Sequence, residues 1–144
     1  MNVLIDHLQP NDVDEVYSLL REHHLPVDGL AGHLETTLVA RGANRILGSA
    51  ALELYGNSAL LRSVAVARSS HGQDIGRDLT LAALQLARER GVLAVYLLTT
   101  TADRYFPRFG FERINRSDVP AAVQSSIEFT SACPSTATVM RRTL

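Results

Sequence analysis

The chain has 144 residues, a length that fits one domain able to bury roughly 68–70% of its unfolded surface without metals or disulfides. Its composition, 46% hydrophobic and 20% charged with no repetitive segment, excludes a disordered chain. The formal net charge of −1 provides no general attraction to nucleic acid or to an anionic membrane, so any anion site must be local. We therefore expect a single domain over residues 1–144.

The compartment and the metal content follow from a few residues. Cys133 is the single cysteine and cannot form an internal disulfide, so we expect it to be a small buried apolar residue. The opening MNVLIDHLQP lacks the regions of a signal peptide, and no apolar run approaches the ~20 residues of a membrane span. These features predict a cytoplasmic protein. His23 and His24 are expected to cap a helix, because no cysteine or carboxylate recurs at ligand spacing, and no metal is predicted.

The first half of the chain is predicted to contain a strand, a helix and a run of three strands. A strand over residues 2–8 precedes a helix that begins at Pro10. Its buried face is expected to hold Val13, Val16, Leu19 and Leu20, which recur at helical spacing. Strands over residues 36–41, 45–55 and 59–66 follow, and the last two are joined by a two-residue hairpin turn at Gly56 and Asn57.

The second half switches from helical to strand periodicity. A helix from Ile75 to Gly91 is expected to bury Ile75, Leu79, Ala82, Ala83 and Leu86. The near-continuous apolar run 93–100 is typical of a strand buried on both faces in a parallel pair. A short helix ending at Gly110, strands over residues 111–115 and 136–142, and a loop-rich stretch over residues 117–134 complete the chain.

The segment SSHGQDIGRDL, residues 69–79, lies between a predicted strand and a predicted helix. The first amides of a helix have no intrahelical partner and the helix dipole is positive there, so this turn could hold a pyrophosphate, with help from Arg68 and Arg77. An ordinary connection in which Asp74 favours the helix N-terminus is the alternative. Because the sequence contains no Walker lysine and no Gly-x-Gly-x-x-Gly pattern, nucleotide hydrolysis and a dinucleotide fold are disfavoured.

Two motifs occur at matching spacing in this order of elements. The phosphate-loop pattern Gln/Arg-x-x-Gly-x-Gly/Ala falls on residues 71–76, and an aromatic-x-x-x-Gly-Phe pattern is present as FPRFGF, residues 106–111. Over essentially its whole length the chain thereby resembles the GNAT family of acyl-CoA N-acyltransferases. The resemblance implies an α/β (α+β mixed-sheet) fold, with about seven strands in a central sheet and about four flanking helices.

A narrower resemblance is carried by the segments LLRSVAV, YLLTTTADRYFPRFGF, DVPAAVQSSIEF and SACPSTATVM. They look like small GNAT proteins found with bacterial arsenic-resistance genes, which are related to amino-acid N-acetyltransferases. This resemblance implies acetyl-CoA as cosubstrate and an amino-acid-like amine as acceptor.

The resemblance also implies roles for individual residues. The parallel strands around Val66 and Leu97 would splay and open a cleft. There a neutral amine attacks the thioester carbonyl, a backbone amide near Val66 polarises the carbonyl oxygen, and a general acid protonates the thiolate. The pantetheine arm would pair with the backbone of Val64, Ala65 and Val66. The pyrophosphate would be held by the loop residues His71, Gly72, Gln73, Asp74, Ile75, Gly76 and Arg77.

The sequence departs from the family pattern at the first motif position, at the central glycine and at the usual general-acid tyrosine, which are here His71, Asp74 and Phe106. Tyr105, one residue earlier, is the nearest hydroxyl and our candidate general acid. Glu53 is the candidate base and His7 a further one. Either could instead be a solvated or structurally paired side chain. Catalysis mainly by positioning, which can supply ~7–11 kcal/mol, is the alternative mechanism.

Arg62 and Ser63 precede the pantetheine segment and are candidate substrate-binding residues. Period-2 alternation predicts that Arg62 shares a strand face with Val64 and Val66. Its guanidinium could clamp a substrate carboxylate there. A salt bridge to Glu53 across the hairpin is the alternative.

Two functional hypotheses remain. The first is an acetyl-CoA-dependent N-acetyltransferase that acts on a small amine by direct attack in a ternary complex. The second, motivated by Asp74 and Phe106, is a GNAT-fold module that binds CoA or regulates but has lost turnover. We expect a small-molecule amine as partner and neither nucleic acid nor a membrane. Association into a homodimer is left open.

Overall fold

The computed structural model describes residues 3–144, so Asn2, the first residue of the predicted strand over residues 2–8, lies outside the described residues. Seven strands form one sheet in the order β1-β2-β3-β4-β5-β7-β6. The pair β4 and β5 is parallel and the other neighbouring pairs are antiparallel. The strands are β1 (Leu4–His7), β2 (Thr37–Gly42), β3 (Arg45–Tyr55), β4 (Ser58–Val66), β5 (Ala94–Thr99), β6 (Glu112–Ile114) and β7 (Thr138–Thr143).

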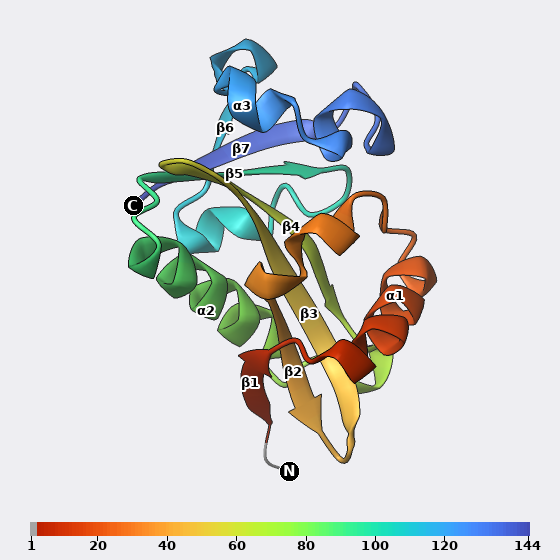
Figure 1. Cartoon of the computed structure of the whole chain (residues 1–144). Helices are drawn as coiled ribbons and strands as arrows, with labels where there is room; N and C mark the ends of the chain where they lie inside the picture. Colours follow the sequence, from red (N-terminus) through yellow and green to blue (C-terminus); the bar gives the residue numbers. More distant parts are fainter. Residues whose placement is uncertain (1–2) are drawn as a thin grey trace.

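Two longer helices, α1 (Val13–Glu22) and α2 (Ile75–Glu89), lie on opposite sides of the central strands (Figure 1). α1 buries Val16, Leu19 and Leu20 in a cluster with Val39 and Ala51. α2 packs on the other face in a larger cluster with side chains of β2 to β5. The predicted apolar faces of both helices are confirmed, although Val13 and Ala82 are only partly buried.

The C-terminal part of the sheet has its own cover. Helix α3 (Ala121–Gln124) and a π-helix (Glu128–Ala132) lie in the stretch predicted to be loop-rich. Val119 and Val123 from this stretch pack against Leu60, Tyr96 and Val139 of β4, β5 and β7. The stretch is therefore partly helical and carries buried side chains, because it covers apolar strand residues that α1 and α2 leave open.

The described residues contain three α-helices and one π-helix together with short 3-10 turns, which agrees with the expectation of about four helices. The helix predicted to end at Gly110 is one 3-10 turn, Phe106–Phe109. Gly110 has φ +86°, a left-handed conformation that ends the turn after four residues. The other 3-10 turns are Pro10–Asp12, Leu30–Thr36, Arg68–Ser70 and Arg116–Asp118.

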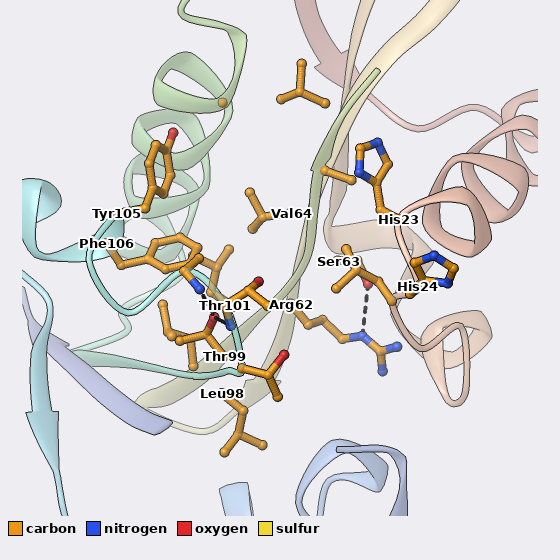
Figure 2. Close-up of a pocket in the computed structure, with 18 of the residues that line it drawn as sticks. His23, His24, Arg62, Ser63, Val64, Leu98, Thr99, Thr101, Tyr105 and Phe106 are labelled. Carbon is orange, nitrogen blue, oxygen red and sulfur yellow. Dashed lines mark hydrogen bonds between the residues drawn. The ribbon is translucent and has the colours of Figure 1, made fainter. Parts of the chain in front are cut away.

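Strand β4 contains a β-bulge that reverses the predicted side-chain alternation. Ala51 pairs with Arg62 and Ser49 with Ala65, so two residues of β4 lie opposite the one residue between them in β3, and Ser63 has φ +59°. The prediction that Arg62 shares a face with Val64 and Val66 is therefore wrong. Val64 packs with the core cluster on the α2 side, whereas Arg62 extends the other way, toward His24 (Figure 2).

No helix within residues 3–144 has both the length and the apolar character needed to cross a membrane.

Candidate active site

A cleft of about 870 Å³ opens where β4 and β5 separate. The two strands pair from Ser58 to Leu60 of β4, with Leu60 opposite Tyr96, but β4 continues to Val66 and β5 to Thr99. The predicted splay around Val66 and Leu97 is thus present. The β4 backbone beyond the last pair faces the cleft and is available to an extended ligand.

The cleft brings together most of the predicted site residues. Those that line it are Arg62, Ser63, Val64, Ala65, Val66, His71, Gly72, Asp74, Ile75, Gly76, Arg77 and Tyr105. Gln73 is exposed in the same loop. Glu53 is outside the lining and contacts Arg62 instead, while His7 is exposed on β1.

The turn before α2 has the geometry expected of an anion site. The first backbone bond of α2 runs from the Asp78 N–H to the Asp74 carbonyl, so the N–H groups of residues 75–77 precede the intrahelical bonds. His71 contacts the Val66 carbonyl through Nε2 at 3.0 Å, which ties the loop to the end of β4. Ser70 Oγ is buried, lines the cleft and has no hydrogen-bond partner among the described residues. It could therefore contact a ligand.

Asp74 adopts the conformation for which glycine is the usual residue. Its φ is +59°, in the left-handed region. Its side chain is 65% exposed, and its carboxylate lies 3.4 Å from the Arg77 guanidinium. The carboxylate thus faces solvent and pairs with Arg77, which leaves the cradle of backbone amides unobstructed.

Tyr105 and Phe106 lie on the opposite side of the cleft from α1. Figure 2 shows the Tyr105 hydroxyl directed toward α2, and a Cβ built on Gly76 would lie 2.8 Å from that oxygen. Burial raises the pKa of Tyr105, so the hydroxyl keeps its proton at neutral pH. Phe106 is buried and packs edge-on against Phe111. The position of the usual tyrosine is therefore apolar.

The other end of the cleft contains a buried charge cluster around Arg62. Its Nη1 donates to Glu53 Oε2 and to the Asp28 carbonyl, both at 2.8 Å. Its Nε donates to Ser63 Oγ at 3.1 Å (Figure 2) and lies 3.4 Å from Glu128 Oε2. The predicted alternative, a salt bridge from Arg62 to Glu53, is therefore present. Because the Arg62 side chain is 0% exposed, each of these contacts is made in the protein interior.

Glu53 is held as an ion. The Tyr55 hydroxyl donates to Oε1 and Arg62 donates to Oε2. Burial alone would raise the pKa of Glu53, but hydrogen bonds from Ser126, Tyr55 and Arg62 outweigh it and the pKa is lowered. Both oxygens of Glu53 are thus occupied by protein donors.

Glu128 was not predicted from the sequence as a site residue. Its side chain is 5% exposed, belongs to the π-helix and lines the cleft. Burial raises its pKa to about 7, although Arg62 opposes the shift. The sequence offered one sign, an acidic residue between the apolar residues Ile127 and Phe129, but this pattern does not indicate that the residue lines a cleft. His23 is the C-cap residue of α1, as predicted, and it also lines the cleft, where its buried Nε2 has no partner among the described residues.

Within residues 3–144, three or more His, Cys, Asp or Glu side chains do not come together as a metal site. The site therefore consists of a backbone loop, an open strand edge and a buried cluster of charged side chains.

A family model for the acetyltransferase (GNAT) domain matches residues 33–113, more than half of the chain. The chain belongs to the GNAT acetyltransferase family. A comparison with curated protein sequences found no match. The family match and the solved structures named below do not link the chain to arsenic resistance.

Three solved structures share the fold over most or all of the chain. N-acetylglutamate synthase from Neisseria gonorrhoeae, complexed with coenzyme A and N-acetyl-glutamate, is 18% identical with a TM-score of 0.85 over 100% of this chain. This chain spans only 35% of that synthase. Rv2747 from Mycobacterium tuberculosis, in complex with CoA and NLQ, is 21% identical with a TM-score of 0.83, covering 98% of this chain and 99% of that protein.

A GNAT acetyltransferase from Brucella melitensis, in complex with acetyl-CoA, is 25% identical with a TM-score of 0.65. The match covers 77% of this chain and 83% of that protein. The predicted GNAT fold with its seven-stranded mixed sheet is thus confirmed.

Proposed function

We propose that this chain is an acetyl-CoA-dependent N-acetyltransferase that acetylates the amine of a small, amino-acid-like molecule by direct attack in a ternary complex. The observation that carries the proposal is the single cleft that joins the amide loop before α2 to the buried cluster around Arg62. An anion site and a charged acceptor site at two ends of one channel are what a two-substrate acyl transfer requires.

Acetyl-CoA would lie along the open part of β4. Its pyrophosphate would contact the amides of residues 73–77, and its pantetheine arm would pair with the backbone of Val64, Ala65 and Val66. Solved GNAT relatives bound to CoA, to acetyl-CoA or to CoA with N-acetyl-glutamate support this cosubstrate and an amino-acid-like acceptor. The narrower resemblance to arsenic-resistance-associated members supports the same class of acceptor, an amino-acid-like amine, and does not identify a particular molecule.

The side chains would divide the chemistry between them. Tyr105, whose raised pKa keeps the hydroxyl protonated, would protonate the leaving thiolate. Arg62 and Ser63 would shape the acceptor end of the cleft, and Glu53 would act through its ion pair with Arg62. Direct clamping of an acceptor carboxylate by Arg62 would require it to exchange one of its present partners.

The test is an acetyl-CoA thiol-release assay with a panel of amino acids and simple amines, run alongside thermal unfolding with acetyl-CoA and with free CoA. A ligand at about 100 times its dissociation constant adds roughly 2.7 kcal/mol to the free energy of unfolding. We expect stabilisation by both ligands and thiol release with at least one amine. Stabilisation without release would favour the CoA-binding module that lacks turnover, and no stabilisation would contradict both functions.

A further inference from the structure

Two buried carboxylates contact Arg62, and the protein holds them differently. Glu53 uses one oxygen to accept from the Tyr55 hydroxyl and the other to accept from Arg62 at 2.8 Å. Glu128 is 3.4 Å from Arg62 and lines the cleft, which Glu53 does not. A molecule in the cleft can therefore reach Glu128, while Glu53 is occupied behind Arg62.

The main chain around Glu128 fixes the carboxylate at the acceptor end of the cleft. Glu128 begins the π-helix Glu128–Ala132, and its backbone N–H donates to Ser126 Oγ at 3.2 Å. Arg62, its ion-pair partner, immediately precedes the bulge at Ser63, where β4 has already separated from β5. The carboxylate thus lies beside the start of the strand edge that acetyl-CoA is proposed to occupy.

The local charge favours a cationic acceptor. Arg62 contributes one positive charge, and Glu53 and Glu128 together can contribute two negative charges. Because Glu53 makes the shorter contact with Arg62, the charge of Glu128 is only partly compensated. An ammonium group bound in the cleft would neutralise the remaining negative charge of Glu128.

We propose that Glu128 binds the acceptor as its ammonium ion and takes one proton from it, a role that rests on the proposed acetyltransferase function. One N–H bond of the ammonium breaks and an O–H bond forms on Glu128. The freed lone pair then forms the C–N bond to the thioester carbonyl carbon, and the C–S bond breaks. The departing thiolate takes a proton from the Tyr105 hydroxyl, and the second ammonium proton, released from the nitrogen, restores that hydroxyl. The third ammonium proton stays on the amide, and Glu128 returns its proton to water.

The groups that face Glu128 are compatible with this role. They are Arg62 on β4, Glu53 on β3 and the Cys133 thiol after the π-helix. The pKa of Glu128, raised by burial to about 7, lets it exchange a proton near neutral pH. Burial also raises the pKa of Cys133 to about 12, so the thiol keeps its proton and does not compete as a base.

The first test uses the wild-type enzyme and an acceptor that is protonated at neutral pH. If Glu128 accepts the proton, log kcat/KM rises with pH only to an inflection near the Glu128 pKa of about 7 and then levels off. Without an enzyme base, the rate follows the neutral amine and rises with unit slope up to the pKa of the acceptor itself. That continuous rise would overturn the proposal.

The second test compares Glu128→Gln with the wild type on two acceptors of the same skeleton, an amine and its aminooxy analogue. The amine is protonated at neutral pH and the analogue is not. We expect kcat to fall about 10²–10⁴-fold with the amine but only a few-fold with the analogue, since no ammonium needs a base there. Equal losses with both acceptors would mean a structural role and would overturn the proposal.

Glu112→Gln is the matched control, because it removes one carboxylate from an exposed position on β6. Glu112→Gln should acetylate both acceptors with the kcat of the wild type. Acetyl-CoA should stabilise Glu128→Gln as it does the wild type. If the wild type itself releases no thiol with any amine, the proposed function fails and this inference fails with it. An active wild type with an equally active Glu128→Gln overturns the inference alone.

Discussion

The two ends of the cleft are built on opposite principles. The loop before α2 presents backbone amides at the surface, and its charged side chains Asp74 and Arg77 are 65% and 53% exposed. The cluster around Arg62 is built from side chains in the interior, where Arg62 and Glu53 are 0% and 1% exposed. Side chains of the loop can therefore change at small cost, whereas each charge of the cluster depends on its partners.

The largest expected contrast is between two arginine substitutions. Arg62→Met leaves Glu53 without its cation in the interior and should lower the free energy of unfolding by about 3–5 kcal/mol. Arg77→Met, the matched change in an exposed pair, should cost about 0–1 kcal/mol. Urea unfolding of both variants measures the difference. Equal losses would show that burial does not separate the two regions.

Tyr105 tests whether one side chain near the loop takes part in the chemistry. If its hydroxyl is the general acid, Tyr105→Phe lowers kcat by about 10²–10⁴-fold and leaves the dissociation constant of acetyl-CoA unchanged. Phe109→Leu, at an aromatic neighbour of Tyr105, controls for disturbed packing. A loss of only a few-fold in kcat for Tyr105→Phe would mean that water protonates the thiolate and that the enzyme catalyses the reaction mainly by positioning the substrates.

The two carboxylates of the cluster should give the stability opposite dependences on pH. The pKa of Glu128 is raised from its ordinary 4.5 to about 7, so its contribution to stability is complete below about 4.5 and is lost as pH rises through about 7. The pKa of Glu53 is lowered, so its contribution is lost at acidic pH, as pH falls through that lowered pKa. We expect Glu128→Gln to remove the decline between pH 4.5 and 7 in the free energy of unfolding. A decline that persists in this variant would assign it to another group.

The smallest effect is expected at Asp74. Removing its carboxylate should tighten acetyl-CoA binding, because a negative charge about 4 Å from a phosphate repels it by ~1 kcal/mol in bulk-like water. The ion pair with Arg77 makes this repulsion smaller. Asp74→Asn removes the charge and tolerates the left-handed backbone, and Asp74→Gly also relieves the backbone. Calorimetric titrations at low and high salt should show tighter binding for both variants, more so at low salt. Weaker binding by Asp74→Asn would mean that the carboxylate holds the loop in shape.

The same contrast explains which parts of the site could be predicted from the sequence. The amide loop was predictable because glycines, a helix start and a preceding strand are local signals, and its place in the cleft agrees with them. The face of Arg62 was predicted wrongly, because the extra residue at Ser63 reverses a period-2 pattern without any marker in the sequence. Glu128 was missed because it comes close to Arg62 only through tertiary packing. The stretch that contains the π-helix packs against β4, and Arg62 lies 66 residues earlier in the sequence.

A structure of this chain with CoA and an amine acceptor bound tests most directly whether the two ends serve one reaction. We expect the pyrophosphate on the amides of residues 73–77 and the pantetheine beside Val64–Val66. We also expect the sulfur in the splay between β4 and β5, and the acceptor nitrogen within hydrogen-bond distance of Glu128. A CoA molecule bound elsewhere, or an acceptor nitrogen remote from Glu128 while the sulfur occupies the splay, would contradict this expectation.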